Sequence, residues 1–353
     1  MKLSDFLKRT KLEKTLLVGY YGGGNYGDEL LLEVMQHLLA QQGVKNLTVT
    51  YQYPDNFKTM HHDLGYKVID IRSKFAIPLH TLKNKNIIIG GGALWGVDMN
   101  LNTLLLSIAL LLSRVFLGKN IYLIGIGYHN STTKMGRFGA WCAGKAARLV
   151  LARDPETYSN FQKITKDTYL DKDIAMYINA HMLKEYRDEA KEIAERLELK
   201  KEVLFVTLRR AANGRLADGF RNYNTYIEEI VHSHPNLSIV IAPLELEAVG
   251  KKEYEIARRL EKKYPHVKML SMPYNPLALV LFFKQYNKNL VLIGPQFHII
   301  MTAQLTGVPY FPVVYDNKVS ELLKLFNTEK QIPLNELKQN DMRMFINQEL
   351  ARE

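Results

Sequence analysis

The segment from residue 289 to residue 309 limits the fold of this chain more than any other. It opens with Leu290 to Ile293, an apolar run with the length and composition of a buried strand. Gly294-Pro295 interrupts the run, and the following pattern predicts a helix of about nine residues that ends at Gly307. A strand followed at once by a helix is the building unit of an α/β sheet.

Two polar side chains, Gln296 and His298, fall where this strand gives way to this helix. In open α/β sheets, ligands bind outside the carboxyl ends of the strands, and anions are stabilised at the amino ends of helices. An imidazole held there can act as an acid, a base or a phosphate contact. The alternative is a histidine that only caps the helix or fills the core.

Similar strand-like runs alternate with helical patterns along the whole chain. Strands are expected at 15–19, 47–51, 67–71, 86–89, 121–124 and 149–152, and then at 203–208, 237–242, 266–271, 290–293 and 310–314. This alternation predicts an α/β protein with two Rossmann-like domains whose parallel sheets face a cleft. We place the N-terminal domain at 1–180, the C-terminal domain at 200–330 and a tail that packs back on the body at 331–353, with a charged helix at 184–199 between the domains.

Two helix starts carry a specific signal. Asp154-Pro155 and Asn275-Pro276 each combine a capping residue with a proline at the first helical position. We therefore predict that helices begin at both places.

The net charge of +11 restricts the partners of the chain. Its basic residues are scattered and no nucleic-acid-binding motif is present, so a phosphorylated substrate or an acidic lipid surface is favoured over nucleic acid. The single cysteine, Cys142, excludes an internal disulfide and a cysteine-based zinc site, and it agrees with a reducing compartment. Residues 1–14 lack the apolar core of a secretory signal. We expect a cytoplasmic protein.

Leu101 to Leu117 is the only stretch that suggests a membrane. Polar residues and Arg114 interrupt it, and it is shorter than the roughly 20 apolar residues that a membrane span requires. We expect a helix buried between layers, with shallow contact with a bilayer surface as the alternative.

Glycine-rich turns follow two of the predicted strands. The loop Gly22 to Asp28 lacks the dinucleotide-binding spacing and the Lys-Ser/Thr of a phosphate-binding P-loop, so it is either a helix-capping turn or a binding loop. The triplet Gly90 to Gly92 exceeds what a cap requires and favours close contact with a ligand or a neighbouring loop. Trp95 could stack on a sugar ring, although a core tryptophan is the more common outcome.

Three arginines follow a strand of the second half. Arg209 and Arg210 stand just past its carboxyl end, and Arg215 lies a few residues on. Their planar guanidinium groups suit carboxylate or phosphate. Most arginine pairs are solvated surface, but this position favours an anion contact for at least one of them.

Other polar residues carry weaker signals. His61 and His62 fall in a polar segment and are expected at the surface. Asp171-Lys172-Asp173 is similar to the paired acids of metal-dependent sugar transferases, but acids at this spacing are common by chance. We expect no metal.

Several stretches, taken in order, resemble the polysaccharide pyruvyl transferase family. They are Gly19–Gly22 with Asn25–Glu29, Gly90–Gly92, Gly125–Gly127, Ala152–Glu156, Leu208–Arg210, Phe297-His298 with Gly307–Pro309, and Tyr315–Val319. The resemblance implies a two-domain fold of the glycosyltransferase GT-B type. It also implies transfer of a group from phosphoenolpyruvate to sugar hydroxyls of a cell-surface glycan or a lipid-linked precursor, which forms a pyruvate ketal and releases phosphate.

The same resemblance implies roles for individual residues. His298 matches the general acid that protonates the methylene carbon of phosphoenolpyruvate. The implied donor contacts are Arg209, Arg210, Arg215 and Gln296. The glycine loops of the first domain would hold the acceptor, through Gly23, Asn25, Gly27, Asp28, Gly91, Gly92 and Trp95. Phosphoenolpyruvate is a co-substrate, no cofactor is implied, and the partners are a sugar or glycan acceptor and, at most peripherally, the inner face of a membrane.

One position departs from the family pattern, because an arginine usually stands where this chain has Gln296. A glutamine brings no charge, and a charge-assisted hydrogen bond is roughly twice as strong as a neutral one. Three interpretations stay open: a pyruvyl transferase in which another basic residue compensates, a nucleotide-sugar-dependent GT-B glycosyltransferase, and a catalytically silent protein of glycan assembly.

Overall fold

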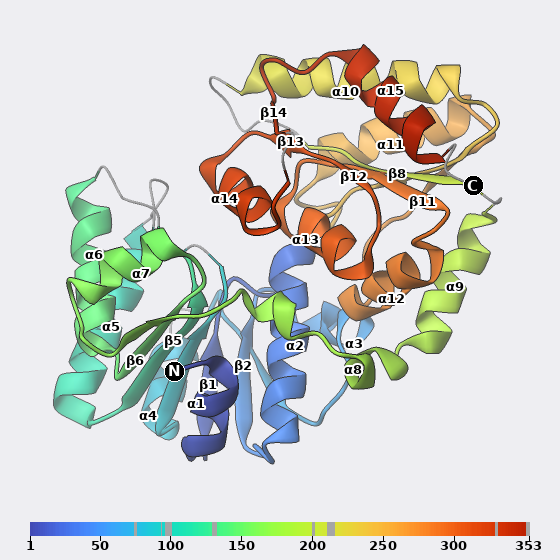
Figure 1. The fold of residues 1–353 in the computed structure, drawn as a ribbon. Coiled ribbons are helices and arrows are strands. Elements are labelled where there is room, and N and C mark those ends of the chain that lie inside the picture. Colours follow the sequence, from blue (N-terminus) through green and yellow to red (C-terminus); the bar gives the residue numbers. More distant parts are fainter. Residues whose placement is uncertain are drawn as a thin grey trace. The chain divides into compact units, whose positions relative to one another are not determined.

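The computed structural model describes residues 1–73, 76–92, 94–95, 101–128, 133–199, 202–209, 216–328 and 331–350. The chain divides into two compact units (Figure 1). The first contains residues 1–23 and 28–178, and the second contains residues 24–27 and 179–353. The loop residues 24–27 therefore group with the second unit, although the chain on both sides of them belongs to the first.

The first unit is built on a parallel sheet of seven strands in the order β3-β2-β1-β4-β5-β6-β7. The strands are β1 (Thr15–Val18), β2 (Leu47–Tyr51), β3 (Lys67–Asp70), β4 (Asn86–Gly90), β5 (Asn120–Ile126), β6 (Leu149–Ala152) and β7 (Thr168–Leu170). Its helices are α1 (Leu3–Arg9), α2 (Tyr26–Gln41), α3 (Phe57–Met60), α4 (Ala76–Lys83), α5 (Leu101–Leu117), α6 (Lys134–Ala146) and α7 (Pro155–Gln162), with short 3₁₀ turns at Pro54–Asn56 and Ile174–Tyr177. Strands β1, β2 and β4 are buried at every position, as expected of parallel strands covered on both faces.

The second unit is built on a parallel sheet of five strands in the order β10-β9-β8-β11-β12. The strands are β8 (Val203–Thr207), β9 (Ser238–Ala242), β10 (Val267–Met269), β11 (Leu290–Ile293) and β12 (Tyr310–Phe311), with a separate parallel pair of β13 (Val313–Val314) and β14 (Ile332–Pro333). Its helices are α8 (Ala180–Lys184), α9 (Arg187–Leu197), α10 (Ala217–Ser233), α11 (Lys251–Lys263), α12 (Pro276–Tyr286), α13 (Phe297–Thr306), α14 (Asn317–Leu325) and α15 (Gln339–Leu350).

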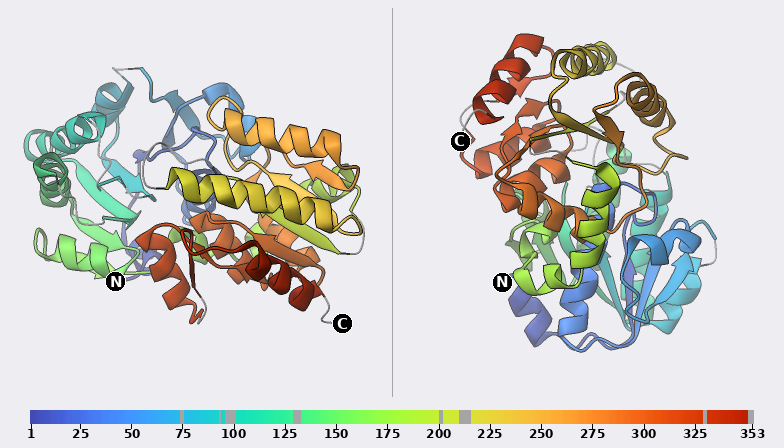
Figure 2. Two further views of the ribbon diagram at one scale, coloured as in Figure 1. Left: turned by 90° about the horizontal axis from the view of Figure 1, so that it is seen from above. Right: turned by 90° about the vertical axis from the view of Figure 1, so that its right-hand side faces the viewer.

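Helices cover both faces of the second sheet (Figures 1 and 2). On one face, Leu204 and Val206 of β8 join a core that takes side chains from α10, α11 and α15. On the other face, Phe205 packs edge to face against Phe283 of α12, with ring centroids 4.8 Å apart. Alternate residues of one strand thus supply the two cores.

In both sheets the strand order reverses beside the first strand of the unit. In the first unit the reversal lies between β1 and β4, and in the second it lies between β8 and β11. At such a switch point the connections leave in opposite directions, which opens a crevice outside the carboxyl ends of the strands. The glycine loops follow β1 and β4, whereas Arg209 and the segment Gly294–His298 follow β8 and β11.

Several local predictions are confirmed. The carboxylate of Asp154 accepts a hydrogen bond from the Thr157 amide at 2.8 Å, and the Asn275 side chain accepts one from the Leu277 amide at 2.8 Å. Each caps a helix that begins with proline, α7 and α12. Gly307 ends α13 in the left-handed conformation, with φ of 77°.

The segments at the two ends of the second unit, the charged helix and the C-terminal tail, both belong to that unit. The charged helix expected between domains is α9, which groups with the second unit and packs against α12. The C-terminal tail contributes Met342 and Ile346 of α15 to the core of the same unit. The ring of Phe345 meets Phe311 at 5.4 Å between centroids.

The expectation that α5 is buried between layers is wrong. It buries only Ser107, Leu110 and Ser113, while Leu105 and Phe116 are 54% and 76% exposed. One side of the helix packs inward, with Leu104, Leu106 and Leu111 partly buried against the core, while other apolar residues face outward. In the described part of the chain, no helix is both long enough and apolar enough to cross a membrane.

Candidate active site

The carboxyl ends of β8 and β11 form the candidate active site in the second unit. A small pocket lies at this edge of the sheet, lined by Asn25, Leu208, Arg209, Pro243, Leu244, Glu245, Gly250, Glu253 and Gln296. All of these residues belong to the second unit, because the loop residues 24–27 group with it. The pocket therefore combines one guanidinium group with two carboxylates and two amides.

The Gln296 side chain bridges the ends of the two central strands. Its Nε2 donates to the Leu208 carbonyl oxygen at 2.7 Å, and its Oε1 accepts from the Thr207 hydroxyl. Gly294 makes this approach possible, because a Cβ atom at that position would overlap the Thr207 Oγ1. The phenol of Tyr223 also donates to the Thr207 carbonyl oxygen, at 2.8 Å. Both ends of the Gln296 amide are thus occupied by β8, which fixes its orientation.

Arg209 lies on an aromatic support just past β8. Its Cζ atom is 4.8 Å from the centroid of the Tyr315 ring, a cation–π distance. The Nζ atom of Lys318 lies 5.9 Å from the same centroid. Asp316 caps α14 and pairs with Lys318 at 3.6 Å. Two cations therefore converge on one tyrosine near the pocket. Two of the predicted donor contacts, Arg210 and Arg215, lie outside the described residues.

His298 occupies the first turn of α13 and is half-buried. Its carbonyl oxygen accepts from the Thr302 hydroxyl at 2.9 Å, and that hydroxyl lies 2.8 Å from the phenol of Tyr26. Burial raises the pKa of Tyr26, so this phenol is neutral at physiological pH. Phe297 meets the imidazole edge to face at 4.9 Å between centroids.

The loop residues 24–27 pack directly on this turn. A Cβ atom on Gly27 would overlap the Nδ1 atom of His298, so only glycine allows the observed approach. Asn25 accepts from the Gly27 amide at 3.2 Å, and the Tyr26 amide donates to the Leu244 carbonyl at 2.8 Å. Asn25 thus takes part in the turn that starts α2 and also lines the pocket, so both interpretations of this loop, a capping turn and a binding loop, stay open.

The remaining glycine-loop residues lie at the switch point of the first sheet. Gly23 is buried after β1, and Gly91 and Gly92 follow β4 with φ of 72° and 82°. The phenol of Tyr21 joins the two loops by donating to the Gly90 carbonyl oxygen. The Asp28 side chain lies beside the loop that follows β4. A Cβ atom added to Gly92 would be 3.5 Å from the Asp28 Oδ1 atom.

Trp95 is not available for stacking on a sugar. Its side chain is fully buried, and its indole N–H donates to the Ser107 hydroxyl of α5 at 2.9 Å. The ring meets Phe161 edge to face at 5.9 Å. The prediction of an acceptor contact is therefore wrong, because the indole fills the core of the first unit.

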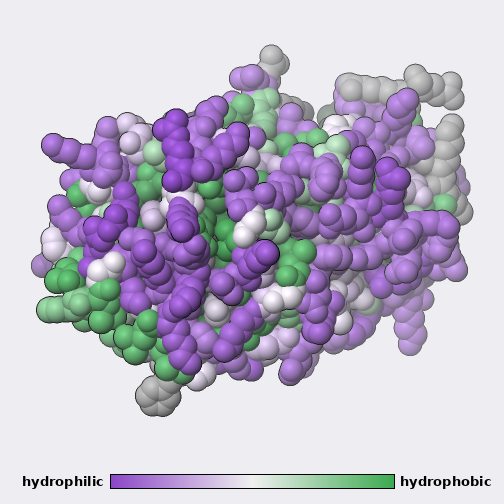
Figure 3. All heavy atoms as spheres, turned by 90° about the horizontal axis from the view of Figure 1, so that it is seen from below, coloured by the Kyte–Doolittle hydropathy of each residue, from purple (hydrophilic) through white to green (hydrophobic). Residues whose placement is uncertain are grey.

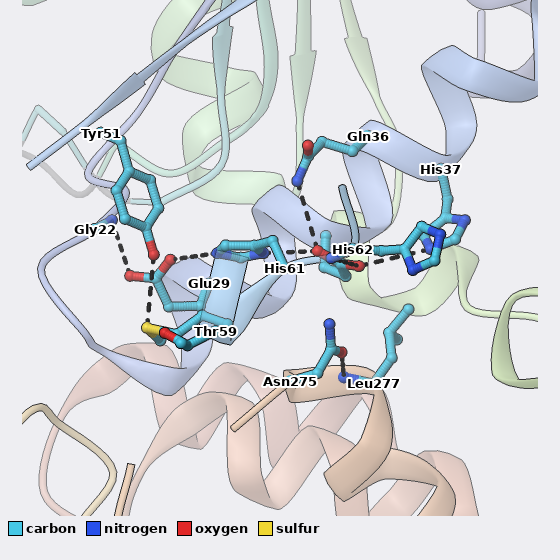
Figure 4. Close-up of polar contacts among 12 residues, drawn as sticks. Gly22, Glu29, Gln36, His37, Tyr51, Thr59, His61, His62, Asn275 and Leu277 are labelled. Carbon is cyan, nitrogen blue, oxygen red and sulfur yellow. Dashed lines mark hydrogen bonds and ion pairs between the residues drawn. The ribbon is translucent and has the colours of Figure 1, made fainter. Parts of the chain in front are cut away.

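A buried ion cluster that the sequence patterns did not predict lies beneath the first glycine loop. The His61 ring lies between two carboxylates, with Nδ1 2.6 Å from Glu33 and Nε2 2.9 Å from Glu29. The second oxygen of Glu29 accepts from the Gly22 amide at 2.9 Å (Figure 4). Burial by itself lowers the pKa of His61, but hydrogen bonds and charges from both glutamates outweigh it and raise the pKa to about 9.

The expectation that His61 is exposed is thus wrong, whereas His62 is exposed as expected. The physical reason is the imidazole's charge, which lies between two buried glutamates and compensates their negative charge. The signal that could have found it is the i,i+4 spacing of Glu29 and Glu33 among the apolar residues of helix α2.

The acids at 171 and 173 have structural partners. Asp171 accepts from the Leu3 amide at 2.6 Å and from the Tyr177 phenol at 2.7 Å. Asp173 pairs with the buried Arg153 at 3.1 Å. Among the residues that the structure describes, no group of three or more histidine, cysteine or acidic side chains could hold a metal ion.

Comparison with known proteins identifies both the family and the fold. The family model described as polysaccharide pyruvyl transferase matches residues 25–317. A comparison with curated proteins finds no match. The chain is similar in structure to UDP-GlcNAc 2-epimerase from Methanocaldococcus jannaschii, with 12% identity, a TM-score of 0.63, and coverage of 97% of this chain and 94% of that one.

Two further solved structures are similar to this chain, with TM-scores slightly below that of the epimerase. MnaA from S. aureus, solved with UDP, has 14% identity, a TM-score of 0.59 and coverage of 97% of this chain and 91% of that one. HepE from Anabaena, solved with UDP and glucose, has 12% identity, a TM-score of 0.59 and coverage of 97% and 90%. At these identities the likeness establishes the fold alone. It confirms the predicted α/β class with two Rossmann-like domains of the GT-B type.

Proposed function

Because the chain belongs to the polysaccharide pyruvyl transferase family, we propose that it transfers a pyruvyl group from phosphoenolpyruvate to two hydroxyls of a sugar. The acceptor is part of a cell-surface glycan or a lipid-linked precursor. The observation that carries the proposal is the position of His298. It stands on the first turn of α13, at the switch point of the second sheet, where an anionic donor is stabilised by the helix amino end.

In the proposed reaction His298 acts as the general acid. Its imidazolium gives a proton to the methylene carbon of phosphoenolpyruvate, which becomes the methyl group of the product. The two sugar oxygens each form a bond to C2, and the bond from C2 to the phosphate oxygen breaks. The two hydroxyl protons return, one to the imidazole and one to the released phosphate. The products are a pyruvate ketal and inorganic phosphate, so atoms and charge balance.

Arg209 and Lys318 are proposed to supply the positive charge that Gln296 lacks. Both lie on the Tyr315 ring, and Arg209 also lines the pocket. A planar guanidinium suits the donor's carboxylate, and an ammonium suits its phosphate. Gln296 then contributes by holding the ends of β8 and β11 together and by lining the pocket.

The acceptor is proposed to bind at the switch point of the first sheet. Gly23, Asp28, Gly91 and Gly92 remain the candidates there, whereas Asn25, with Gly27, joins the donor residues of the second unit. The carboxylate of Asp28 can accept hydrogen bonds from sugar hydroxyls.

The direct test is turnover of phosphoenolpyruvate with a panel of free and lipid-linked sugars. Phosphate release and the methyl signal of the ketal in NMR spectra are measured together. We expect His298→Ala to lower the rate by about 10²- to 10⁴-fold, the usual contribution of a general acid. The matched control is His181→Ala, an exposed histidine of α8, which should leave the rate unchanged. Full turnover by His298→Ala would exclude the assigned role.

A second candidate is transfer from a nucleotide sugar. The pocket favours it in one respect, since Glu245 and Glu253 suit the hydroxyls of a ribose better than a phosphate. Thermal midpoints with phosphoenolpyruvate, UDP and phosphate distinguish the candidates, because only a ligand of the folded state raises the midpoint. Stabilisation by phosphoenolpyruvate that is lost in Arg209→Ala supports pyruvyl transfer. Stabilisation by UDP alone supports the second candidate, and binding without turnover supports a silent assembly protein.

A further inference from the structure

Exposed apolar side chains concentrate on three helices of the first unit. Of the nineteen large hydrophobic residues that are exposed in the described part of the chain, eleven lie on α4, α5 and α6. Figure 3 shows apolar atoms gathered at the left edge of one face, the side on which Figure 1 draws α5 and α6. A concentration of this kind marks an interaction surface, whereas single exposed apolar residues do not.

Helix α6, which packs against α5, differs from an ordinary amphipathic helix, because its small residues face inward and its large apolar residues face outward. The inward residues of α6 are small, among them Gly136, Gly139 and Ala143. Its large residues point outward, with Phe138 and Trp141 51% and 44% exposed and their rings stacked 6.0 Å apart. The stability of the first unit does not explain these aromatic side chains, because they are not part of its core.

The outward residues form two stripes at helical spacing. On α5 they include Leu105, Leu112 and Phe116, and on α6 they include Met135, Phe138 and Trp141. We refer to these six residues as the α5–α6 face. The two helices pack against each other, so the stripes belong to neighbouring elements.

The charge of the same region is strongly one-sided. Residues 76–148 contain eight lysines and arginines and a single acidic residue, Asp98. They therefore carry +7 of the net charge of +11. Basic side chains occur on or beside both helices, at Arg114, Lys119, Lys134, Arg137, Lys145 and Arg148.

We propose that the α5–α6 face docks on the surface of an anionic lipid bilayer. Leucine, phenylalanine and tryptophan side chains would enter the boundary between headgroups and acyl chains, and the exposed Lys134, Arg137 and Lys145 would contact the lipid phosphates. Lys119 and Arg114 are not among these contacts, because both donate to backbone carbonyls. Stacked aromatic rings beside basic residues are typical of such interfacial helices. A second copy of this chain is a poorer occupant, because two copies of a face with this charge repel each other.

The proposal is independent of the proposed reaction, since lipid binding is measured without turnover. The full chain is mixed with vesicles of phosphatidylcholine alone or with three parts in ten phosphatidylglycerol, and the bound fraction is measured by sedimentation. We expect binding to the anionic vesicles only, weakened at least tenfold between low and high salt. Tryptophan emission should shift to the blue on binding. The chain has two tryptophans and Trp95 is fully buried, so this signal reports Trp141.

Variants assign the binding to this face. Phe116→Ser with Phe138→Ser should weaken vesicle binding at least tenfold, whereas the leucine substitutions at both positions should retain it. Leu325→Ser with Met344→Ser is the matched control, because these residues are 60% and 52% exposed in the second unit. Unchanged thermal midpoints would establish that all variants fold.

Three results would overturn the proposal. They are failure to bind anionic vesicles, binding that survives the serine substitutions on α5 and α6, and a dimer in solution that these substitutions dissociate. The last result would make the α5–α6 face an interface between copies of the chain.

Discussion

The buried cluster of His61, Glu29 and Glu33 links pH to the stability of the first unit. The folded state raises the pKa of His61 from 6.5 to about 9, so it binds a proton more tightly than the unfolded chain does. The contribution of protonated His61 to the free energy of unfolding is therefore complete below about pH 6.5 and is lost as the pH rises through about 9. The loss should amount to about 3 kcal/mol. Urea unfolding of the first unit, followed between pH 6 and pH 10, measures it.

The control for this prediction is His61→Ala. Removing the cation leaves two buried carboxylates that share only the remaining hydrogen bonds and the His37–Glu33 pair, which should cost about 3–5 kcal/mol at pH 6.5. The pH dependence above pH 6.5 should largely disappear in this variant. An equal slope in the wild type and in His61→Ala would mean that a group other than His61 titrates.

At the active site, the contact between Gly27 and His298 gives a second residue-level prediction. Gly27 lies within α2 at negative φ, so alanine is compatible with the backbone there. As a better helix former, alanine should by itself raise the free energy of unfolding by roughly 1 kcal/mol. Its methyl group must, however, displace the imidazole. We expect Gly27→Ala to keep its thermal midpoint and to lose at least tenfold in turnover. A parallel substitution, Gly43→Ala, meets no atom within 4 Å of the added Cβ but strains the backbone, because Gly43 has φ of 72°, so it should lower the thermal midpoint and leave turnover unchanged.

At the scale of elements, the ends of β8 and β11 are joined by side chains as well as by the backbone ladder. Gln296→Arg introduces the family's usual residue but cannot accept the hydrogen bond of the Thr207 hydroxyl. We expect it to lower the free energy of unfolding by about 1–3 kcal/mol, the cost of an unsatisfied buried group. Chemical denaturation of the single variant measures this cost.

The second variant of this pair is Thr207→Val. In Gln296→Arg the Thr207 hydroxyl has lost its acceptor, and Thr207→Val removes that hydroxyl. The double variant should therefore recover part of the free energy of unfolding that Gln296→Arg loses. Strictly additive effects of the two substitutions would show that the Thr207–Gln296 contact does not couple β8 to β11. Phosphoenolpyruvate binding by the same variants shows whether the arginine adds donor affinity in this sequence.

At the scale of the whole molecule, each unit has its own sheet and its own core. Units of this kind unfold as separate cooperative transitions unless their interface is large. We expect two calorimetric transitions. His61→Ala should lower only one of them, and Gly294→Ala, whose methyl group overlaps Thr207, should lower only the other. A single transition lowered equally by both substitutions would contradict this expectation.

The sequence by itself located most of the strands, although it missed β7 and merged β12 and β13, which belong to different sheets, into one strand at 310–314. The apolar run before Gly294-Pro295, the capped starts at Asp154 and Asn275, and the stop at Gly307 are local patterns, and each is found where it was expected. Local patterns also placed Arg209 and His298 after β8 and β11, because a residue that follows a strand must lie at the edge of its sheet.

Only the tertiary structure decided what each side chain meets. Tyr26 contacts Thr302 across 276 positions of the chain, and His61 reaches Glu29 across 32. No periodicity encodes such pairs, so the partners of His61 and the grouping of residues 24–27 with the second unit required the structure. The same holds for α5, whose composition shows that it is apolar. Which of its sides packs inward depends on its neighbours, among them α6 with its small buried residues.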